Sequence, residues 1–260
     1  MEDYQQFIDK VKRKTGIDLF LYKEAQMKRR LTSLREKRGF SNFDDYFKAL
    51  TNDQTLFEEF LQRMTINVSE FYRNPQRWSV LEEKILPRLL ANQTKIKTWS
   101  AACSTGEEPY SLMMMLLKYL SPRQIDLLAT DLDQSILDRA MKGFYPERSL
   151  KEVNSNMLKQ YFINEQVGYR AKEELKKTIT FRRHNLLAEP FDKGFDLIIC
   201  RNVMIYFTEQ AKDELYQKFS NALKPGGVLF VGSTEQIFNP QRYGFETEDT
   251  FFYKKINESR

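Results

Sequence analysis

The chain has 260 residues, of which 41% are hydrophobic and 30% are charged, and its formal net charge is +5. This composition is ordinary for a globular protein with one large domain or two smaller ones. The longest apolar run, residues 112–117, is too short to cross a bilayer, and no secretory signal opens the chain. Two cysteines and one histidine exclude a Cys/His metal site. We therefore expect a cytoplasmic protein with reduced thiols and no metal.

Residues 1–74 are predicted to form a helical domain, because apolar side chains recur there at helical spacing. A linker helix is expected over residues 75–94. Residues 22–38 carry seven lysines and arginines against two glutamates, an excess equal to the net charge of the whole chain. An apolar stripe on this segment would leave four cations facing outward, namely Lys28, Arg29, Arg35 and Lys37. The alternatives are a solvated helix face and a docking surface for an acidic partner, and the size of the excess favours docking.

From residue 95 to residue 260 strand and helix patterns alternate, which is typical of an α/β domain with a mostly parallel sheet. The last segment, residues 245–256, is predicted to form an antiparallel terminal hairpin. A small inserted subdomain is expected at residues 145–175, with a helix and a hairpin of its own. The expected strands are 95–101, 126–131, 178–184, 195–201 and 227–232, and the expected helices are near 108–120, 133–142 and 208–223.

The turn from Ala101 to Gly106 joins the first expected strand to a helix through small residues. Small side chains let a ligand approach backbone N–H groups, and the helix N-terminus adds partial positive charge. In an open parallel sheet, ligands bind at the carboxyl ends of the strands. Asp131 ends the next strand, where a carboxylate that accepts hydrogen bonds from ribose hydroxyls is expected. The alternative is that Asp131 caps the following helix, for which Asp133 is the better candidate.

A helix that ends in Leu-Lys-Pro-Gly-Gly before a buried strand resembles class I S-adenosylmethionine-dependent methyltransferases. Four motifs in order extend the resemblance over nearly the whole chain, to the CheR-type chemotaxis receptor glutamate O-methyltransferases. They are Thr-Ile-Asn-Val-Ser-Glu-Phe-Tyr-Arg at 65–73, Trp-Ser-Ala-Ala-Cys-Ser-Thr-Gly-Glu-Glu-Pro-Tyr-Ser at 99–111, Ala-Thr-Asp-Leu-Asp at 129–133 and Cys-Arg-Asn-Val-Met-Ile-Tyr-Phe at 200–207.

The resemblance implies a helical N-terminal domain, a Rossmann-like methyltransferase domain and a small β-rich insert. It also implies S-adenosylmethionine as cofactor, S-adenosylhomocysteine as product, and the cytoplasmic helical bundle of chemotaxis receptors as partner. Arg73 and Tyr206 match the residues that border the transferred methyl group. Cofactor contacts are implied for Asn67, Ser69, Arg73, Glu108, Asp131, Asn185, Leu186, Arg201 and Asn202.

Methyl transfer to a glutamate side chain needs few catalytic residues. A glutamate side chain has a pKa of about 4.3, so it is an anionic nucleophile at neutral pH without a general base. The expected task of the enzyme is therefore to position two bound reactants. Arg73 is expected to orient a carboxylate, either that of the cofactor or that of the substrate. Tyr206 is expected to lie beside the sulfonium.

Two other functions are considered: a class I methyltransferase that acts on RNA, and a non-catalytic receptor adaptor that binds the cofactor. The modest net charge disfavours RNA, and Arg73 with Tyr206 disfavours an adaptor. We expect a monomer that does not bind nucleic acid and does not insert into a membrane. Some family members grip a receptor peptide with a glycine-rich loop in the insert. The corresponding residues 163–169 contain only Gly168, which argues against such tethering.

Overall fold

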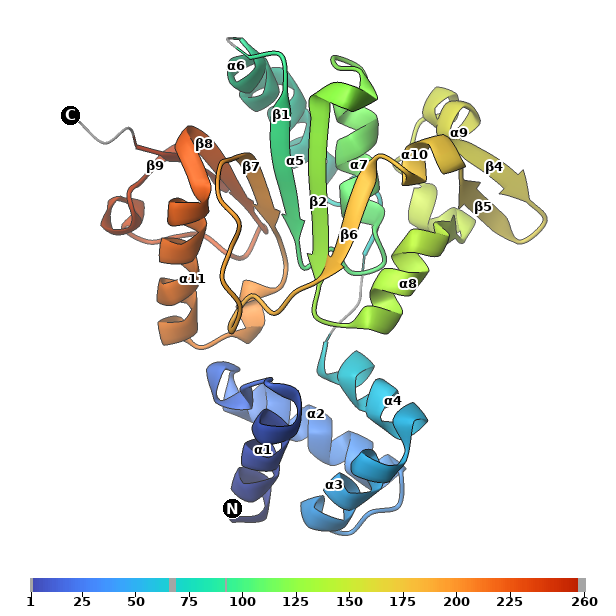
Figure 1. Cartoon of the computed structure of the whole chain (residues 1–260), viewed down its shortest axis with the longest axis vertical. Coiled ribbons are helices and arrows are strands. Elements are labelled where there is room, and N and C mark those ends of the chain that lie inside the picture. Colours follow the sequence, from blue (N-terminus) through green and yellow to red (C-terminus); the bar gives the residue numbers. More distant parts are fainter. Residues whose placement is uncertain (1, 66–68, 92, 257–260) are drawn as a thin grey trace.

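The structure, a computed structural model, describes residues 2–65, 69–91 and 93–256. It has a helical lobe and an α/β lobe (Figure 1). In the helical lobe, Tyr4, Phe7 and Val11 share one buried face of the first helix, and the Phe7 ring packs against Phe43. The Asn42 side chain accepts a hydrogen bond from the Asp45 N–H and so caps the helix that begins at Phe43. The helices are α1 (Glu2–Thr15), η1 (Leu19–Leu21), α2 (Glu24–Lys37), α3 (Phe43–Asn52) and α4 (Gln54–Met64).

The α/β lobe is built on a seven-stranded sheet with the order β6-β2-β1-β7-β8-β10-β9. The strands from β6 to β8 pair in parallel, whereas β10 and β9 pair antiparallel. This mostly parallel sheet with an antiparallel terminal hairpin confirms the predicted fold class. The strands are β1 (Ile96–Ala101), β2 (Ile125–Asp131), β6 (Ile179–Arg183), β7 (Phe195–Cys200), β8 (Leu223–Val231), β9 (Phe245–Asp249) and β10 (Phe252–Lys255).

The central strands are buried on both faces, so successive side chains enter two different cores. Leu197 and Ile199 of β7 belong to one cluster, while Ile198 between them belongs to the other. The Ile198 cluster continues into the helical lobe and includes Phe7, so the two lobes share a core. The helices around the sheet are α5 (Pro75–Val80), the π-helical η2 (Leu81–Ile85), α6 (Leu86–Leu90), α7 (Glu107–Leu116), η3 (Pro122–Gln124), α8 (Gln134–Lys142), α11 (Glu209–Ala222) and η6 (Pro240–Tyr243).

The segment between the helical lobe and β1 contains one irregular helical turn. The Leu86 N–H donates to Leu81 O, five residues back. Pro87 follows directly and has no N–H to donate, so a regular α-helical hydrogen-bond ladder cannot continue through it. The expected linker helix is therefore three short helical pieces.

The inserted segment forms a separate three-stranded sheet with the order β3-β5-β4. The predicted helix at 155–161 and the predicted hairpin are both present. The first strand, at Phe144–Tyr145, was not predicted, because two residues are too few to show a period. The elements are β3 (Phe144–Tyr145), η4 (Glu147–Leu150), α9 (Ser155–Tyr161), β4 (Phe162–Glu165), β5 (Gly168–Ala171) and α10 (Glu173–Lys176).

The Leu-Lys-Pro-Gly-Gly segment differs from the sequence prediction. The helix α11 ends at Ala222, and β8 begins at Leu223 rather than at residue 227. Phe195 pairs with Leu223 and Leu197 with Val228, so the extra residues bulge out of the strand. Pro225 cannot donate to the ladder and Gly226 has φ +77°, which explains why the bulge lies there.

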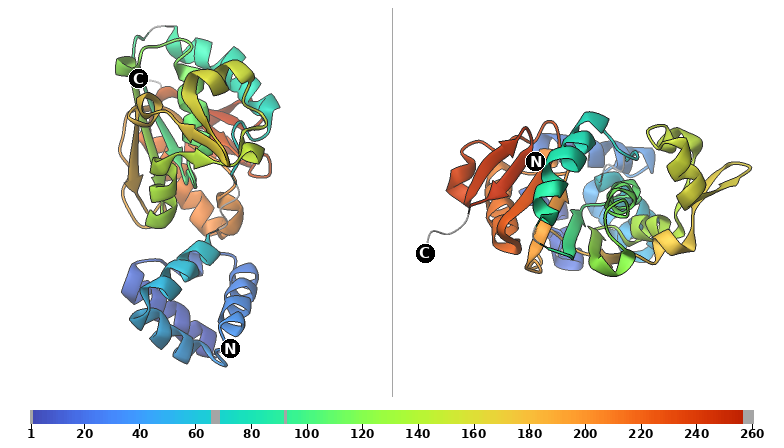
Figure 2. Two further views of the ribbon diagram at one scale, coloured as in Figure 1. Left: turned by 90° about the vertical axis from the view of Figure 1, so that its right-hand side faces the viewer. Right: turned by 90° about the horizontal axis from the view of Figure 1, so that it is seen from above.

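The two lobes meet beside the carboxyl ends of the parallel strands. The arrowheads of β1, β2, β6 and β7 point toward the helical lobe (Figure 1), and Figure 2 shows the same two-lobed arrangement from the side. The chain after η1 runs along the segment before α11: Lys23 N–H donates to Tyr206 O at 2.9 Å, and Thr208 N–H donates to Leu21 O at 2.9 Å. Tyr22 and Phe207 pack edge to face between them, with ring centroids 5.1 Å apart.

Candidate functional site

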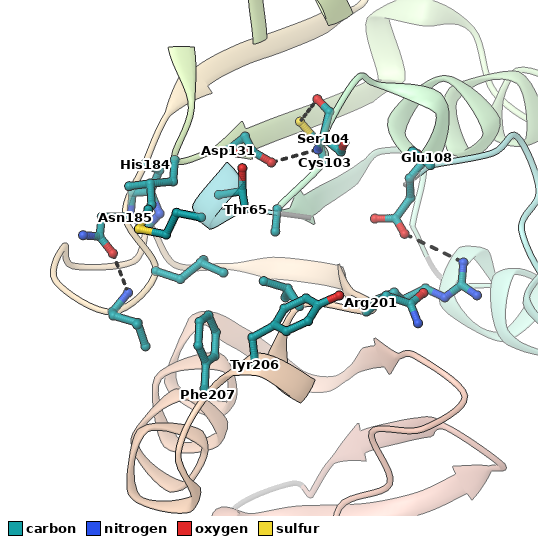
Figure 3. A pocket seen from close by; sticks show the side chains of 18 of the residues that line it. Thr65, Cys103, Ser104, Glu108, Asp131, His184, Asn185, Arg201, Tyr206 and Phe207 are labelled. Carbon is teal, nitrogen blue, oxygen red and sulfur yellow. Dashed lines mark hydrogen bonds and ion pairs between the residues drawn. The ribbon is translucent and has the colours of Figure 1, made fainter. Parts of the chain in front are cut away.

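A cavity opens at this junction, between the strand ends and the helical lobe. Its open space, including the part exposed to solvent, is about 1020 Å³, and apolar and polar side chains both line it, as is usual for ligand sites. Figure 3 shows Asp131 and Ser104 on one side, Tyr206 and Phe207 on the other, and Glu108 with Arg201 at one end. The predicted residues that line it are Ser69, Arg73, Glu108, Asp131, Asn185, Leu186, Arg201, Asn202 and Tyr206. Asn67, also predicted, lies outside the described residues.

The predicted cradle between β1 and α7 has an unusual backbone. Ala102 and Ser104 have φ of +63° and +51°, and Gly106 has φ +95°. Non-glycine residues in this region cost energy and cluster at functional sites. A Cβ on Gly106 would lie 2.9 Å from the Cβ of Ala140 and 2.9 Å from the Tyr145 hydroxyl, so glycine is required there. The turn thus brings the chain close to the end of β2.

Asp131 holds this turn from the next strand. Its Oδ2 accepts a hydrogen bond from Ser104 N–H at 2.8 Å, and its Oδ1 accepts one from Asp133 N–H at 3.1 Å. Burial raises the pKa of Asp131 to about 6, against the lowering effect of these N–H groups. A carboxylate has about four acceptor positions, so these backbone N–H groups still leave room for a ligand donor. The helix cap is supplied by Asp133, whose side chain accepts from Ser135 N–H, as predicted.

Glu108 and Arg201 form the charged end of the cavity. Glu108 Oε2 lies 3.8 Å from Arg201 Nη1, and Glu108 Oε1 accepts from Ser100 Oγ at 2.7 Å. Burial raises the pKa of Glu108 to about 6, while the Arg201 charge acts in the opposite direction. The guanidinium lies over the Phe230 ring at 4.7 Å, and burial lowers its pKa. Glu108 is therefore mostly ionised at neutral pH and can accept hydrogen bonds from a ligand ammonium group.

Arg73 is presented by a strained segment. Its neighbours Tyr72 and Asn74 have φ of +50° and +62°, and Tyr72 is a bulky residue for which this is an outlier. The Arg73 carbonyl accepts hydrogen bonds from Arg201 Nη2 at 2.9 Å and from Trp78 Nε1 at 3.1 Å. Two buried side chains from different elements therefore hold the backbone of Arg73 in place. Its side chain lines the cavity, where it can meet a carboxylate.

Tyr206 lies in η5 (Met204–Tyr206), and a residue of the helical lobe covers its ring. Arg30 of α2 places its Cζ 5.4 Å from the Tyr206 ring centroid, and its Nη1 donates to Met64 O at 2.6 Å. Burial raises the pKa of Tyr206, so its hydroxyl stays protonated at neutral pH. Arg30 was not predicted as a site residue. Its position three residues after Met27 and four before Leu34, beside the apolar stripe, is the signal that could have found it.

The basic helix α2 carries the predicted cationic surface, with one correction. Arg29 and Lys37 are exposed, and Lys28 Nζ lies 5.3 Å from the Tyr4 ring. Arg35 was expected to face outward, but only 13% of its side chain is exposed. Its Cζ packs 4.7 Å from the Phe43 ring. The reason is that Arg35 follows Leu34 at the edge of the stripe, where its long apolar stem covers the core.

The remaining predictions concern the histidine and the cysteines. His184 lines the cavity, and its Nε2 lies 3.2 Å from Pro190 O, while its ring packs edge to face with Trp99. Burial lowers its pKa. Cys103 and Cys200 are both free and buried, as expected. Asn185 Oδ1 accepts a hydrogen bond from Leu187 N–H at 3.0 Å, so the amide oxygen is used within the loop. Among the described residues, no cluster of three or more His, Cys, Asp or Glu side chains could hold a metal ion.

Comparison with known proteins identifies the family. Residues 67–252 match the CheR methyltransferase, SAM binding domain, and residues 2–65 match the CheR methyltransferase, all-alpha domain. The chain belongs to the CheR methyltransferase family. It is an S-adenosylmethionine-dependent methyltransferase of chemotaxis, which confirms the resemblance found in its motifs. Within the described part of the chain, no helix is long and apolar enough to cross a membrane.

Curated relatives share nearly the whole chain. A chemotaxis protein methyltransferase of Listeria innocua is 49% identical over 255 residues, covering 98% of this chain and 97% of the relative. The protein of the same name from Borreliella burgdorferi is 37% identical over 85% of this chain and 83% of its own. That from Escherichia coli is 32% identical over 88% of this chain and 82% of its own.

Proposed function

We propose that this CheR family member transfers the methyl group of S-adenosylmethionine to glutamate side chains of chemotaxis receptors, forming methyl esters and S-adenosylhomocysteine. The observation that carries this is the gathering of a carboxylate, a cation and an aromatic hydroxyl around one cavity at the strand ends, represented by Asp131, Arg73 and Tyr206. Receptor glutamates as acceptors follow from the family and from the chemistry of the site.

The donor set fits the cofactor group by group. Asp131 retains acceptor positions for ribose hydroxyls, and Glu108 suits the ammonium group of the methionine part. Arg73 suits its carboxylate. Leu186 and Leu187 offer an apolar wall for adenine, beside the free amide donors of Asn185. S-Adenosylmethionine supplies an electrophilic methyl on a sulfonium, so no metal is needed for the transfer.

The residues of this chain then have to bind and orient the acceptor. A receptor glutamate is ionised at neutral pH and needs no base, which agrees with a site where Tyr206 keeps its proton. The Tyr206 hydroxyl can donate a hydrogen bond that orients the incoming carboxylate. Arg30 lies over the Tyr206 ring from the helical lobe and adds positive charge where an anion has to arrive. Catalysis in this scheme comes from orientation and from a matched electrostatic field.

The exposed cations of α2 are the proposed docking surface for the receptor. Arg29 and Lys37 would attract the acidic side chains of a helical bundle, with Lys28 and Arg35 as partly buried contributors. This surface lies on the same helix as Arg30, which reaches Tyr206. A receptor helix that docks on α2 is therefore placed next to the cavity.

We propose that the enzyme acts as a cytoplasmic monomer without binding nucleic acid.

The decisive experiment incubates the purified chain with methyl-labelled S-adenosylmethionine and membranes that contain chemotaxis receptors. Alkali should release the label as methanol, because glutamyl methyl esters are hydrolysed by base. In a parallel incubation with RNA, alkali-stable label on the nucleotides would favour the RNA methyltransferase alternative. Binding of the cofactor with no transfer in a single-turnover assay would favour a non-catalytic adaptor.

Arg73→Ala should lower methyl transfer by about 10²-fold or more, because a bidentate carboxylate contact and the orientation that it provides are lost. Transfer is measured by the methanol-release assay at saturating receptor. Arg123→Ala is the matched control, since Arg123 is an exposed residue of η3 that does not line the cavity. If Arg73→Ala turns over like Arg123→Ala, Arg73 has no part in the mechanism.

A further inference from the structure

A buried carboxylate lies behind the loop that carries Asn202 and Tyr206. Glu235 follows β8 in a surface loop whose neighbours Thr234 and Gln236 are exposed, yet Glu235 itself is only 5% exposed. Two contacts fix this loop: Glu235 N–H donates to Gly232 O at 3.0 Å, and Ile237 N–H donates to the Tyr253 hydroxyl at 2.8 Å. The Glu235 side chain is therefore directed inward by an anchored backbone.

The Glu235 carboxylate is held by backbone N–H groups. Its Oε2 accepts from Asn202 N–H at 2.7 Å and from Gly232 N–H at 2.8 Å, while its Oε1 accepts from Ile205 N–H at 3.2 Å. Burial raises its pKa, and the N–H groups, including that of Met204, lower it. A buried anion satisfied in this way is costly to disturb.

Backbone atoms of two other residues pack tightly around Glu235 Oε2. Asn202 has φ +60°, a left-handed conformation that asparagine tolerates better than other side chains. A Cβ on Gly232 would overlap Glu235 Oε2 and would lie 2.9 Å from Asn202 N, so only glycine lets the carboxylate reach both N–H groups. Gly232, Asn202 in its left-handed backbone conformation and the buried Glu235 therefore meet at one point of the fold.

We propose that Glu235 is a positioning residue for methyl transfer whose two oxygens hold the two ends of the 202–206 loop. This rests on the proposed function of the cavity. Oε2 holds the Asn202 end, which lines the cofactor side of the cavity, and Oε1 holds the end that leads into Tyr206. Glu235 touches neither reactant. It acts through the 202–206 loop and so links Asn202, on the cofactor side of the cavity, to Tyr206 on the acceptor side.

The two ends can be separated by substitution. Glu235→Gln keeps one carbonyl oxygen, which should stay with the two shorter hydrogen bonds of Oε2, so its amide N–H₂ would face Ile205 N–H. The hydrogen bond to Ile205 N–H, next to Tyr206, is then lost, while the hydrogen bond to Asn202 N–H is kept. Gly232→Ala does the opposite, because its Cβ displaces Oε2 from Asn202. Glu214→Gln is the matched control on the exposed face of α11.

For each variant, affinity for S-adenosylhomocysteine is measured by calorimetry, kcat for receptor methylation by methanol release, and folding by thermal denaturation. Glu235→Gln should lower kcat by about tenfold or more with less than about threefold change in affinity, while Gly232→Ala should weaken affinity by about tenfold. Both should keep a cooperative unfolding transition.

The proposal is overturned if Glu235→Gln matches Glu214→Gln in both parameters. It is also overturned if affinity and kcat fall together in step with a lost unfolding transition, which is the behaviour of a purely structural residue. Wild-type protein that binds S-adenosylhomocysteine but methylates no receptor would refute the proposed function instead. In that case the Gly232→Ala affinity alone decides whether Glu235 holds the Asn202 end.

Discussion

Two buried carboxyl groups in the cavity, Asp131 and Glu108, both have a pKa raised to about 6 by burial. A cofactor that donates hydrogen bonds to them stabilises their charged forms. The free protein therefore keeps these acids close to their titration range, and ligand binding completes their ionisation. Affinity for the cofactor should depend on pH near neutrality, which is unusual for a site built on aspartate and glutamate.

We expect affinity for S-adenosylhomocysteine to fall as the pH is lowered from 7.5 through about 6, because protonated Asp131 is a poorer acceptor. Asp131→Asn should weaken binding by about tenfold or more and reduce this pH dependence. Calorimetry at several pH values measures both effects. Asp126→Asn, an exposed change on the same strand, is the control. Affinity that is independent of pH in the wild-type protein would contradict this role for Asp131.

The Asp131 carboxyl also affects the free energy of unfolding, and here a lower pH is favourable. The folded pKa of Asp131 is about 6 and its ordinary value is 3.8, so the folded state binds the proton more tightly than the unfolded state. Ionised Asp131 therefore lowers the free energy of unfolding above pH 6, and this cost is relieved as the pH falls from about 6 toward 3.8. Asp131→Asn should remove this contribution, so a comparison of ligand-free thermal unfolding at pH 7.5 and 5.5 in both proteins isolates it.

At the scale of elements, α2 serves two purposes on different faces. One face buries Met27, Leu31 and Leu34 in the helical core, and Arg30 beside that stripe reaches the cavity. Arg29 and Lys37 of the same helix are exposed to solvent, and both line a surface groove together with Arg30 and Tyr206. An excess of one charge on an exposed helix accelerates association with an oppositely charged partner and makes it sensitive to salt.

Reversing the charge of two residues on this face, Lys28→Glu together with Arg29→Glu, should weaken receptor binding by about tenfold at low salt. Cofactor affinity should be unchanged, because neither residue lines the cavity. Binding is measured by co-sedimentation with receptor membranes over a range of salt concentrations. Lys95→Glu with Lys193→Glu changes the net charge equally just before β1 and β7, at the opposite end of these strands from the cavity, and it should bind normally. Equal binding by both double variants would rule out docking through α2.

At the scale of the whole molecule, the two lobes share one core and meet at the cavity. Phe207 is 3% exposed and packs against Tyr22, which itself lines the cavity. Backbone hydrogen bonds on either side of this ring pair join residues 21–23 to residues 206–208. The helical lobe is therefore a wall of the cavity as well as the carrier of the proposed docking surface.

Phe207→Ala should lower the free energy of unfolding by about 3–5 kcal/mol, because a buried ring is removed and leaves a cavity between the lobes. The expected fall in Tm is roughly 10 °C for a protein of this size. Phe238→Ala is the control, since Phe238 is 80% exposed and its removal should change stability by less than about 0.5 kcal/mol. Thermal denaturation with and without S-adenosylhomocysteine measures both, and a Phe207→Ala protein as stable as the control would contradict a shared core.

Periodicity and motif order in the sequence were enough for the fold class and for most of the site. Parallel strands bring their carboxyl ends to one edge, so residues that follow them, such as Asp131 and Asn202, had to meet there. The helix cap at Asp133 and the small residues of the cradle followed from local rules that need no tertiary information.

Only the tertiary structure decided which side chains from distant segments support those residues. Arg30 reaches Tyr206 across the lobes, Arg201 holds the Arg73 carbonyl 128 residues away, and Glu235 reaches Asn202 from the end of the next strand. None of these contacts has a sequence period, because each depends on how lobes and loops pack and not on the repeat of a helix or strand. For Arg201 and Glu235 the physical reason is that a buried polar group has to be satisfied wherever its partner lies in space.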